Sequence, residues 1–171
     1  ASSIRNSLFY SGCATIFVLC AGGAIAFILA RKKMRGKEIL DACAMLPLAV
    51  PGIVLAYGYV TSFTGSWLDP FSNPVILLVV SYAIRRLPLV VRALYSGLLQ
   101  AGVALEEAGA GLGASAAAAF RLITLPLIRP HIIGAAIIAF VFSMLEVSDS
   151  LILAMQEEFY PMTKAIYSLV A

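Results

Sequence analysis

The chain contains an apolar run, from Leu8 to Ala30, that carries no charged residue. At 1.5 Å per residue in a helix, a run of this length crosses the roughly 30 Å of hydrocarbon in a bilayer. The composition agrees with a membrane location, since 61% of the residues are hydrophobic and only 12% are charged, whereas about a quarter are charged in a typical globular domain. The sequence therefore predicts an all-α membrane protein.

A run of basic residues follows this first span directly. Short loops rich in Lys and Arg stay on the cytoplasmic side of a membrane, so we expect the N-terminus to face outward. The run consists of Arg31, Lys32, Lys33, Arg35 and Lys37. It is not a phosphate-binding GxxxxGK[ST] loop, because Glu38 follows Lys37 where Ser or Thr is required. If ATP is used, we expect another chain to bind it.

The remaining apolar segments predict one membrane domain over residues 1–171, with about four complete spans and the start of a fifth. The expected spans cover residues 7–30, 39–63, 74–89 and 130–146, and a truncated fifth begins at about residue 163. A helix that begins at Thr163 and stops with the chain favours a fragment of a longer polypeptide.

Pro47, Pro51 and Gly52 interrupt the second expected span. Its backbone ladder must therefore break or kink near the middle, and the freed groups need neighbours or a water-filled path. Two interpretations stay open. Pro51 and Gly52 either belong to a flexible helix that lines a solute pathway, or mark a tolerated kink.

The third expected span is short, since Arg85 and Arg86 arrive soon after it begins. We expect it to reach the cytoplasmic headgroups near Arg85–Pro88 and to continue as an interfacial piece to Leu99, with the arginines extending toward water and anionic lipid. The alternative is a ligand-binding role, because ionisable residues at membrane depth are functional candidates.

Glu146 and Asp149 follow the fourth span, three positions apart, where they can share one helical face. They are candidates to gate a pathway or to attract a cationic cargo. The plainer interpretation is a pair of solvated loop carboxylates at a subunit surface, and the sequence alone favours it.

Residues typical of metal binding or catalysis do not cluster in this sequence. Cys13, Cys20 and Cys43 lie in apolar runs without a thiol or histidine at ligand spacing, so we expect no metal and no cofactor in this chain. His131 is the single histidine and lacks a Ser, Cys or acidic partner at a recognisable spacing. The sequence thus predicts a protein that is not an enzyme, and no nucleic-acid partner is expected.

Residues 103–126, between the third and fourth spans, predict a short helical hairpin on the cytoplasmic side. Glu106 and Glu107 complement the positive end of a helix dipole, and Gly113 can adopt the positive φ that turns the chain. A small-faced helix of this kind suits a groove in another protein better than a lipid surface, because lipid-bound helices need a broad apolar face.

The hairpin resembles the motif that defines the permease subunits of type I binding-protein-dependent ABC importers: Glu-Ala-Ala, three residues, Gly, nine residues, then Ile-x-Leu-Pro. The matching positions are Glu107, Ala108, Gly113, Ile123, Leu125 and Pro126. Gly109 stands where the family usually has Ala, which keeps the position small but loosens the helix by about 1 kcal/mol. Arg86–Pro88 and Glu146–Asp149 look most like the permeases for ferric iron, thiamine and phosphonates.

The resemblance implies a multi-span permease core of the type I ABC importer kind, in the cytoplasmic (inner) membrane of a bacterium or archaeon. It implies three partners: an ATPase that holds ATP and Mg²⁺, a second permease subunit or fused half, and an external solute-binding protein. The motif residues, with Gly109, then couple to the ATPase, and Glu107 contacts it or caps the helix. The competing hypothesis is an ATP-independent secondary transporter or channel, which should bury ionisable residues within its spans.

Overall fold

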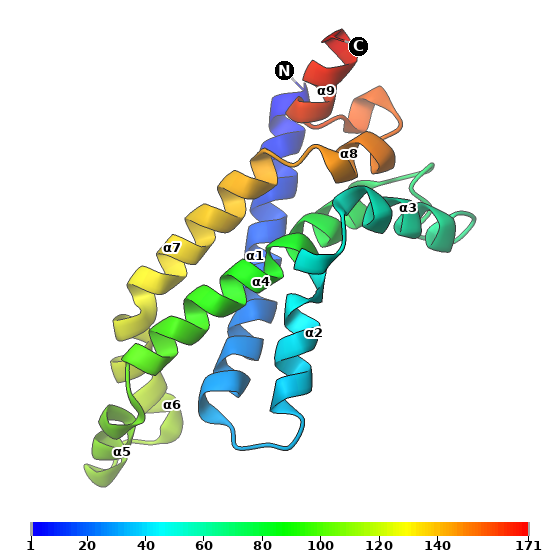
Figure 1. Ribbon diagram of the computed structural model, residues 1–171. Coiled ribbons are helices and arrows are strands. Elements are labelled where there is room, and N and C mark those ends of the chain that lie inside the picture. Colours follow the sequence, from blue (N-terminus) through cyan, green and yellow to red (C-terminus); the bar gives the residue numbers. More distant parts are fainter. Residues whose placement is uncertain (1, 171) are drawn as a thin grey trace.

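The computed structural model describes residues 2–170, which are largely helical and contain no strand (Figure 1). The helices are α1 (Ser2–Arg31), α2 (Lys37–Ala49), α3 (Gly52–Phe63), α4 (Val75–Gln100), α5 (Val103–Gly111), α6 (Ala116–Ala119), α7 (Leu125–Met144), α8 (Ser148–Leu153) and α9 (Met162–Val170). A π-helical turn, η1 (Phe120–Thr124), joins α6 to α7, and a 3-10 turn, η2 (Glu157–Phe159), precedes α9. The prediction of an all-α protein is confirmed.

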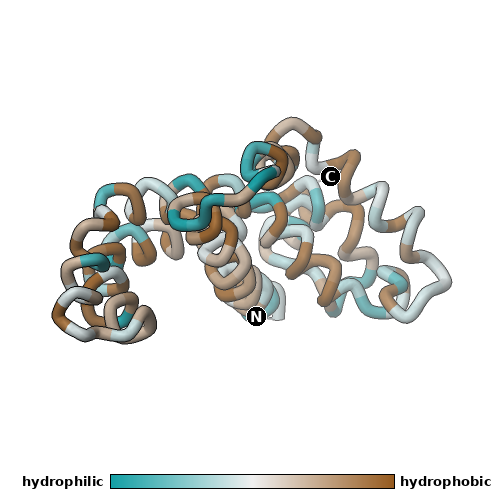
Figure 2. Tube along the Cα trace, turned by 90° about the horizontal axis from the view of Figure 1, so that it is seen from below, coloured by the Kyte–Doolittle hydropathy of each residue, from teal (hydrophilic) through white to brown (hydrophobic). Residues whose placement is uncertain are grey.

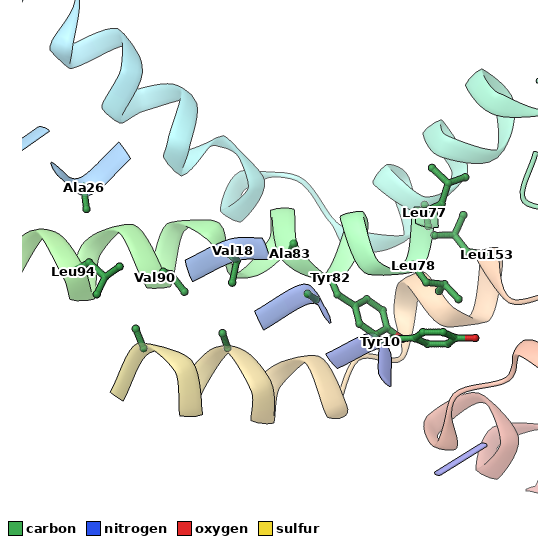
Figure 3. Close-up of a cluster of buried hydrophobic side chains, with 14 of the residues drawn as sticks. Tyr10, Val18, Ala26, Leu77, Leu78, Tyr82, Ala83, Val90, Leu94 and Leu153 are labelled. Atoms are coloured by element: carbon green, nitrogen blue, oxygen red, sulfur yellow. The ribbon is translucent and has the colours of Figure 1, made fainter. Parts of the chain in front are cut away.

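The core forms where α1, α4 and α7 pack against one another. Figure 3 shows buried side chains of α1, α4 and α8 meeting in this core, with Tyr10 and Val18 from α1 and Leu78 and Val90 from α4 among them. Gly22 permits a close approach of α1 to α4, since a Cβ at this position would stand 2.9 Å from Cγ1 of Val90. Small residues at helix contacts are a main source of helix association in lipid.

Many large apolar side chains are exposed on the helices, and Figure 2 shows hydrophobic residues along much of the length of the chain. Within residues 2–170, two helical segments, Ser2–Arg31 and Ala116–Met144, are long and apolar enough to cross a membrane. Helices α2 and α3 pass the same test as a pair, but they meet at a bend of 100°. The bend lies at Val50 and Pro51, which confirms the predicted break in this segment.

Different elements lie at the two ends of the molecule (Figure 1). One end, which we call the hairpin end, carries α5, α6 and the basic residues that connect α1 to α2. The opposite end carries the start of α1, together with α8 and α9. The basic loop and the hairpin thus lie at one end, as a shared cytoplasmic location requires.

Helix α4 runs without a break from Val75 to Gln100 with Pro88 buried inside it. The sequence predicts that this segment continues past Arg85–Pro88 to Leu99, and the helix does so. The expected position of the two arginines at the cytoplasmic headgroups is what differs. Arg86 pairs with Glu146, which follows the end of α7 farthest from the hairpin, so the two arginines do not lie at the hairpin end. The physical reason is that paired arginines need not extend to lipid headgroups.

The helix expected from residue 130 also begins earlier. Pro126 stands in the first turn of α7, directly after the π-helical turn η1. Through η1, α7 is continuous with α6, so the second arm of the hairpin and the following helix form one segment, Ala116–Met144. A movement of the hairpin therefore acts directly on this helix.

Candidate functional site

The turn of the hairpin is closed by a Schellman motif at the end of α5. Gly113 has φ 90°, and its N–H donates to the carbonyl of Ala110 at 2.9 Å. The N–H of Ala114 donates to the carbonyl of Gly109 at 3.0 Å. This pair of hydrogen bonds needs a left-handed residue between them, which glycine supplies without steric cost. The structure thus places the bend at Gly113, as the sequence predicts.

Two motif positions far apart in the sequence contact each other across the hairpin. Gly109 is buried, and a Cβ there would stand 2.8 Å from Cδ1 of Ile123. Ile123 therefore occupies the space that the usual Ala would partly fill. The departure from the motif at Gly109 has a packing reason, and Ile123 holds the two arms together from the inside.

Several exposed side chains of the hairpin have no partner among residues 2–170. Glu107 and Ala108 are exposed, and Glu107 forms no hydrogen bond or ion pair with the described residues. Gly102 occupies the N-cap position of α5, so the suggested capping role of Glu107 is wrong. Leu125 and Pro126 are also exposed, at the start of α7.

Sequence reasoning missed the two most exposed apolar residues of the hairpin. Leu112, next to the turn glycine, is 91% exposed, and Leu122 in η1 is 77% exposed. The signal was present in the sequence, since both are large apolar residues in a segment expected to leave the membrane.

Glu106, rather than Glu107, ties the hairpin to the rest of the protein. Its Oε1 lies 2.8 Å from Nη2 of Arg31 and accepts a hydrogen bond from Nε of the same arginine at 3.0 Å. The hydroxyl of Thr124 donates to this oxygen as well, at 2.8 Å. Arg31 was grouped with the basic loop in the sequence, but its side chain is only 7% exposed.

A second group of charged side chains lies buried near the opposite end. Nη2 of Arg86 lies 2.5 Å from Oε2 of Glu146, and Nε of Arg85 lies 3.2 Å from the same oxygen. Asp149 lies 3.9 Å from Nε of Arg85 and accepts a hydrogen bond from Ser81. We call these five residues the ion cluster. Two arginines face two carboxylates in it, so the charges balance.

The burial of the carboxylates overturns the favoured interpretation from sequence. Glu146 is 5% exposed and Asp149 is 0% exposed, so neither is a solvated loop residue. The turn at Leu145–Val147 folds α8 back toward α4, which brings both carboxylates to the arginines. Buried charges persist only where they are paired in this way.

The ion cluster also meets the break between α2 and α3. Gly52 is buried there, and a Cβ on it would overlap the guanidinium of Arg85 and stand 3.0 Å from Oδ1 of Asp149. Pro51, the exposed residue before it, is the N-cap of α3. The structure thus gathers Gly52, Glu146 and Asp149, which the sequence suggested separately, at one place.

Comparison with known proteins gives consistent matches. Residues 22–168 match the family described as "Binding-protein-dependent transport system inner membrane component". The chain is 35% identical over 146 residues to the putative ferric transport system permease protein FbpB 1 of Haemophilus influenzae, which covers 85% of this chain and 23% of that protein. It is 32% identical over 165 residues to the molybdate/tungstate transport system permease protein WtpB of Pyrococcus furiosus, covering 96% of this chain and 63% of that protein.

A third relative is the molybdenum transport system permease protein ModB of Escherichia coli, 33% identical over 152 residues, or 83% of this chain. The chain spans less than a quarter of the length of the ferric permease and under two thirds of the length of WtpB.

Proposed function

Because the chain belongs to the family of binding-protein-dependent transport system inner membrane components, we propose that it forms the solute pathway of an ATP-driven importer and couples to a cytoplasmic ATPase through its hairpin. The chain is an integral membrane permease component, and such permeases are not themselves enzymes. ATP and Mg²⁺ are bound by the separate ATPase subunit in this proposal.

The proposal rests on a difference between two sets of hairpin residues: one set shapes the hairpin, and the other is exposed. Three motif residues shape the hairpin itself. Gly113 sets the turn, and Gly109 packs against Ile123 to hold the two arms together. Glu107, Leu112 and Leu122 face outward without partners among residues 2–170. Burying each leucine in a partner's groove contributes up to about 1.5–3 kcal/mol. A hairpin with a fixed turn that exposes two leucines and a carboxylate is suited to docking on another protein.

The proposal also assigns a position to each of the other partners. The hairpin end faces the cytoplasm of a bacterial or archaeal cell in this proposal, and the chain crosses the inner membrane several times. A second permease subunit or fused half completes the pathway, and an external solute-binding protein delivers cargo at the opposite end. ATP-driven closure of the ATPase pair then moves the hairpins, and rigid-body movement alternates access to the pathway.

We place the gate of this pathway at the break between α2 and α3, where Pro51 and Gly52 meet Glu146 and Asp149 of the ion cluster. Oδ1 of Asp149 and Nη1 of Arg85 are buried without hydrogen-bond partners in the described chain. A buried polar atom without a partner costs free energy, and a second state that supplies the partner would recover it. Because the two arginines balance the two carboxylates, the cluster's charge gives no reason to prefer a cationic cargo over an anionic one.

The competing hypothesis, an ATP-independent transporter, expects ionisable residues buried within spans, and α4 does bury two arginines. Their partners are carboxylates of the same chain, at 2.5 and 3.2 Å, so they have a structural explanation. The outward face of the hairpin has no use in that hypothesis. Family membership and the hairpin together favour the ATP-driven importer.

Co-purification and uptake test this function. The full-length permease, extracted with the products of its neighbouring genes, should retain an ATP-hydrolysing subunit. Vesicles with this complex and the binding protein should accumulate radioactive ferric iron or molybdate, the solutes in the relatives' names, only when ATP is supplied. Accumulation that follows an ion gradient without ATP supports the competing hypothesis and contradicts the proposal.

A further inference from the structure

We propose that α1 is a coupling rod, which joins the hairpin at one end to the outer segment, residues 157–163, at the other. Arg31 and Asn6 are its positioning residues. The inference rests on the proposed function, because it takes the ATPase to be what moves the hairpin. It adds a route by which that movement reaches the opposite end of the protein.

At the hairpin end, Arg31 is the last residue of α1 and directs its guanidinium onto Oε1 of Glu106 with two nitrogens. Thr124, which is buried in η1, donates to the same oxygen. One carboxylate oxygen therefore connects α1 to both arms of the hairpin. A guanidinium that grips a carboxylate with two N–H groups fixes direction as well as distance.

A second contact joins the same elements one turn earlier in α1. The rings of Phe27 and Phe120 meet edge to face, with centroids 5.7 Å apart and an interplanar angle of 89°. Phe120 begins η1, the return arm of the hairpin. The hairpin is thus held to α1 by an aromatic contact and a charged one, and neither involves its outward docking face.

The burial of Arg31 distinguishes this contact from an ordinary basic loop. Lys32 and Lys33, which follow it, are exposed, as expected for residues that extend toward water and lipid headgroups. Arg31 is 7% exposed instead and turns back to Glu106. A basic residue that serves only to orient the chain in the membrane stays hydrated, because burying a charge costs free energy.

The body of α1 is one unbroken helix of 30 residues, which corresponds to about 45 Å at 1.5 Å per residue. It contains no proline, and its packing against α4 and α7 holds it along its length. Sharp kinks arise at prolines, π-bulges or Gly/Ser pairs, and α1 stays continuous through its one glycine pair, Gly22 and Gly23. In this proposal a displacement of one end of the helix therefore moves the other end.

At the opposite end, three side chains of α1 bind the backbone of the outer segment. Nδ2 of Asn6 donates to the carbonyl of Glu158 at 2.7 Å, and Oγ of Ser7 accepts from the N–H of Met162 at 2.7 Å. The hydroxyl of Tyr10 donates to the carbonyl of Phe159 at 3.3 Å. All three side chains are buried, so the contacts are shielded from competing water.

The outer segment leads on to the ion cluster. The hydroxyl of Thr163 donates to the carbonyl of Glu146 at 2.7 Å, and Glu146 carries the ion pair with Arg86. Contacts are therefore continuous from Glu106 through α1 and the outer segment to the cluster. The contacts at the two ends of α1 therefore belong to one path, so a substitution at either end should interrupt the same path.

The test measures how far the external binding protein accelerates ATP hydrolysis by the complete importer in vesicles, since this signal must cross the whole membrane domain. The purified cognate binding protein is the probe. We expect Arg31→Ala and Asn6→Ala each to lower the acceleration by about two- to thirtyfold, the range of residues that carry coupling between sites. Both variants should retain as much ATPase as the unmodified complex, because the docking face is untouched. For the same reason, their rate of ATP hydrolysis without the binding protein should equal that of the unmodified complex.

The double variant tests whether the ends act in series. A single rod predicts that Arg31→Ala combined with Asn6→Ala loses no more than the worse single variant, whereas independent local effects multiply. Lys32→Ala, which removes a neighbouring exposed charge, is the control and should change nothing. Exchange of the charges in Arg31→Glu with Glu106→Arg should recover part of the acceleration. Where Arg31→Ala lowers the yield of folded complex, Arg31→Lys replaces it, since it keeps the charge but loses the two-nitrogen grip.

Multiplied losses in the double variant, or unchanged acceleration in Arg31→Ala with its ATPase bound, overturn the coupling rod. Failure of the unmodified complex to retain an ATPase instead contradicts the proposed function itself.

Discussion

Cδ1 of Ile123 lies 2.8 Å from the position that a Cβ on residue 109 would occupy, so Gly109 and Ile123 form one complementary contact across the hairpin. Ile123 belongs to the second arm and Gly109 to the first. The contact explains how a sequence with glycine at a position where alanine is usual keeps the same hairpin.

The size of residue 109 should therefore control the hairpin. Gly109→Leu must displace Ile123 and costs about 1–3 kcal/mol through overpacking, so we expect weaker retention of the ATPase and faster hydrogen exchange in α5. Gly109→Ala gains up to about 1 kcal/mol of helix propensity and needs only a small shift of the flexible end of Ile123. Its retention should stay near the unmodified level. Equal retention in both variants contradicts the contact.

The turn at Gly113 gives a second prediction. Gly113→Val forces a branched residue to φ 90° and costs at least about 1–2 kcal/mol. We expect transport driven by ATP to fall while membrane insertion and yield stay unchanged, because the turn lies outside the spans. Gly111→Ala is the matched control, since a Cβ there meets nothing within 4 Å and its φ is not positive. Full transport by Gly113→Val rules out the coupling role of the turn.

Removal of Arg86 should destabilise the protein. Arg86→Ala leaves Glu146 buried with one partner fewer and also removes a hydrogen bond to the carbonyl of Phe142. The expected loss is about 3 kcal/mol, the low end for a broken buried pair, because Arg85 remains close to Glu146. Thermal unfolding in detergent measures the loss. Arg92→Ala, which breaks the exposed pair with Asp41, should cost less than about 1 kcal/mol.

The gate predicts a sharp difference between two glycines of α3. Gly52→Ala places a methyl group on the guanidinium of Arg85, so we expect lower thermal stability by about 1–3 kcal/mol and impaired uptake. Gly58→Ala meets nothing within 4 Å and should leave both unchanged. Normal uptake by a folded Gly52→Ala variant removes Gly52 from the gate.

The helices and the hairpin follow from local signals. The uncharged run before Arg31, the prolines at the break between α2 and α3, and Gly113 at the turn each act within a few residues, so the sequence predicts them. The spacing of the motif likewise identifies the hairpin, because Gly113 adopts a positive φ that few other residues tolerate, and Pro126 favours the first turn of a helix.

The contacts between distant charges were not predictable in the same way. Arg31 and Glu106, and Arg86 and Glu146, are far apart in the sequence and carry no periodicity that links them. An isolated carboxylate after a span is usually solvated, so the sequence favours a loop position for Glu146. The fold buries it because α8 returns to α4, and only tertiary structure shows that return.

The most direct test of the account is a photo-activated crosslinker placed at Leu112, the residue with 91% of its surface exposed beside the turn. Leu169 in α9 is 86% exposed near the opposite end and provides the control position. We predict that, in intact membranes, the crosslinker at position 112 captures an ATP-binding subunit and the one at position 169 does not. Capture of that subunit from position 169, or no capture from position 112, contradicts the docking of the hairpin on an ATPase.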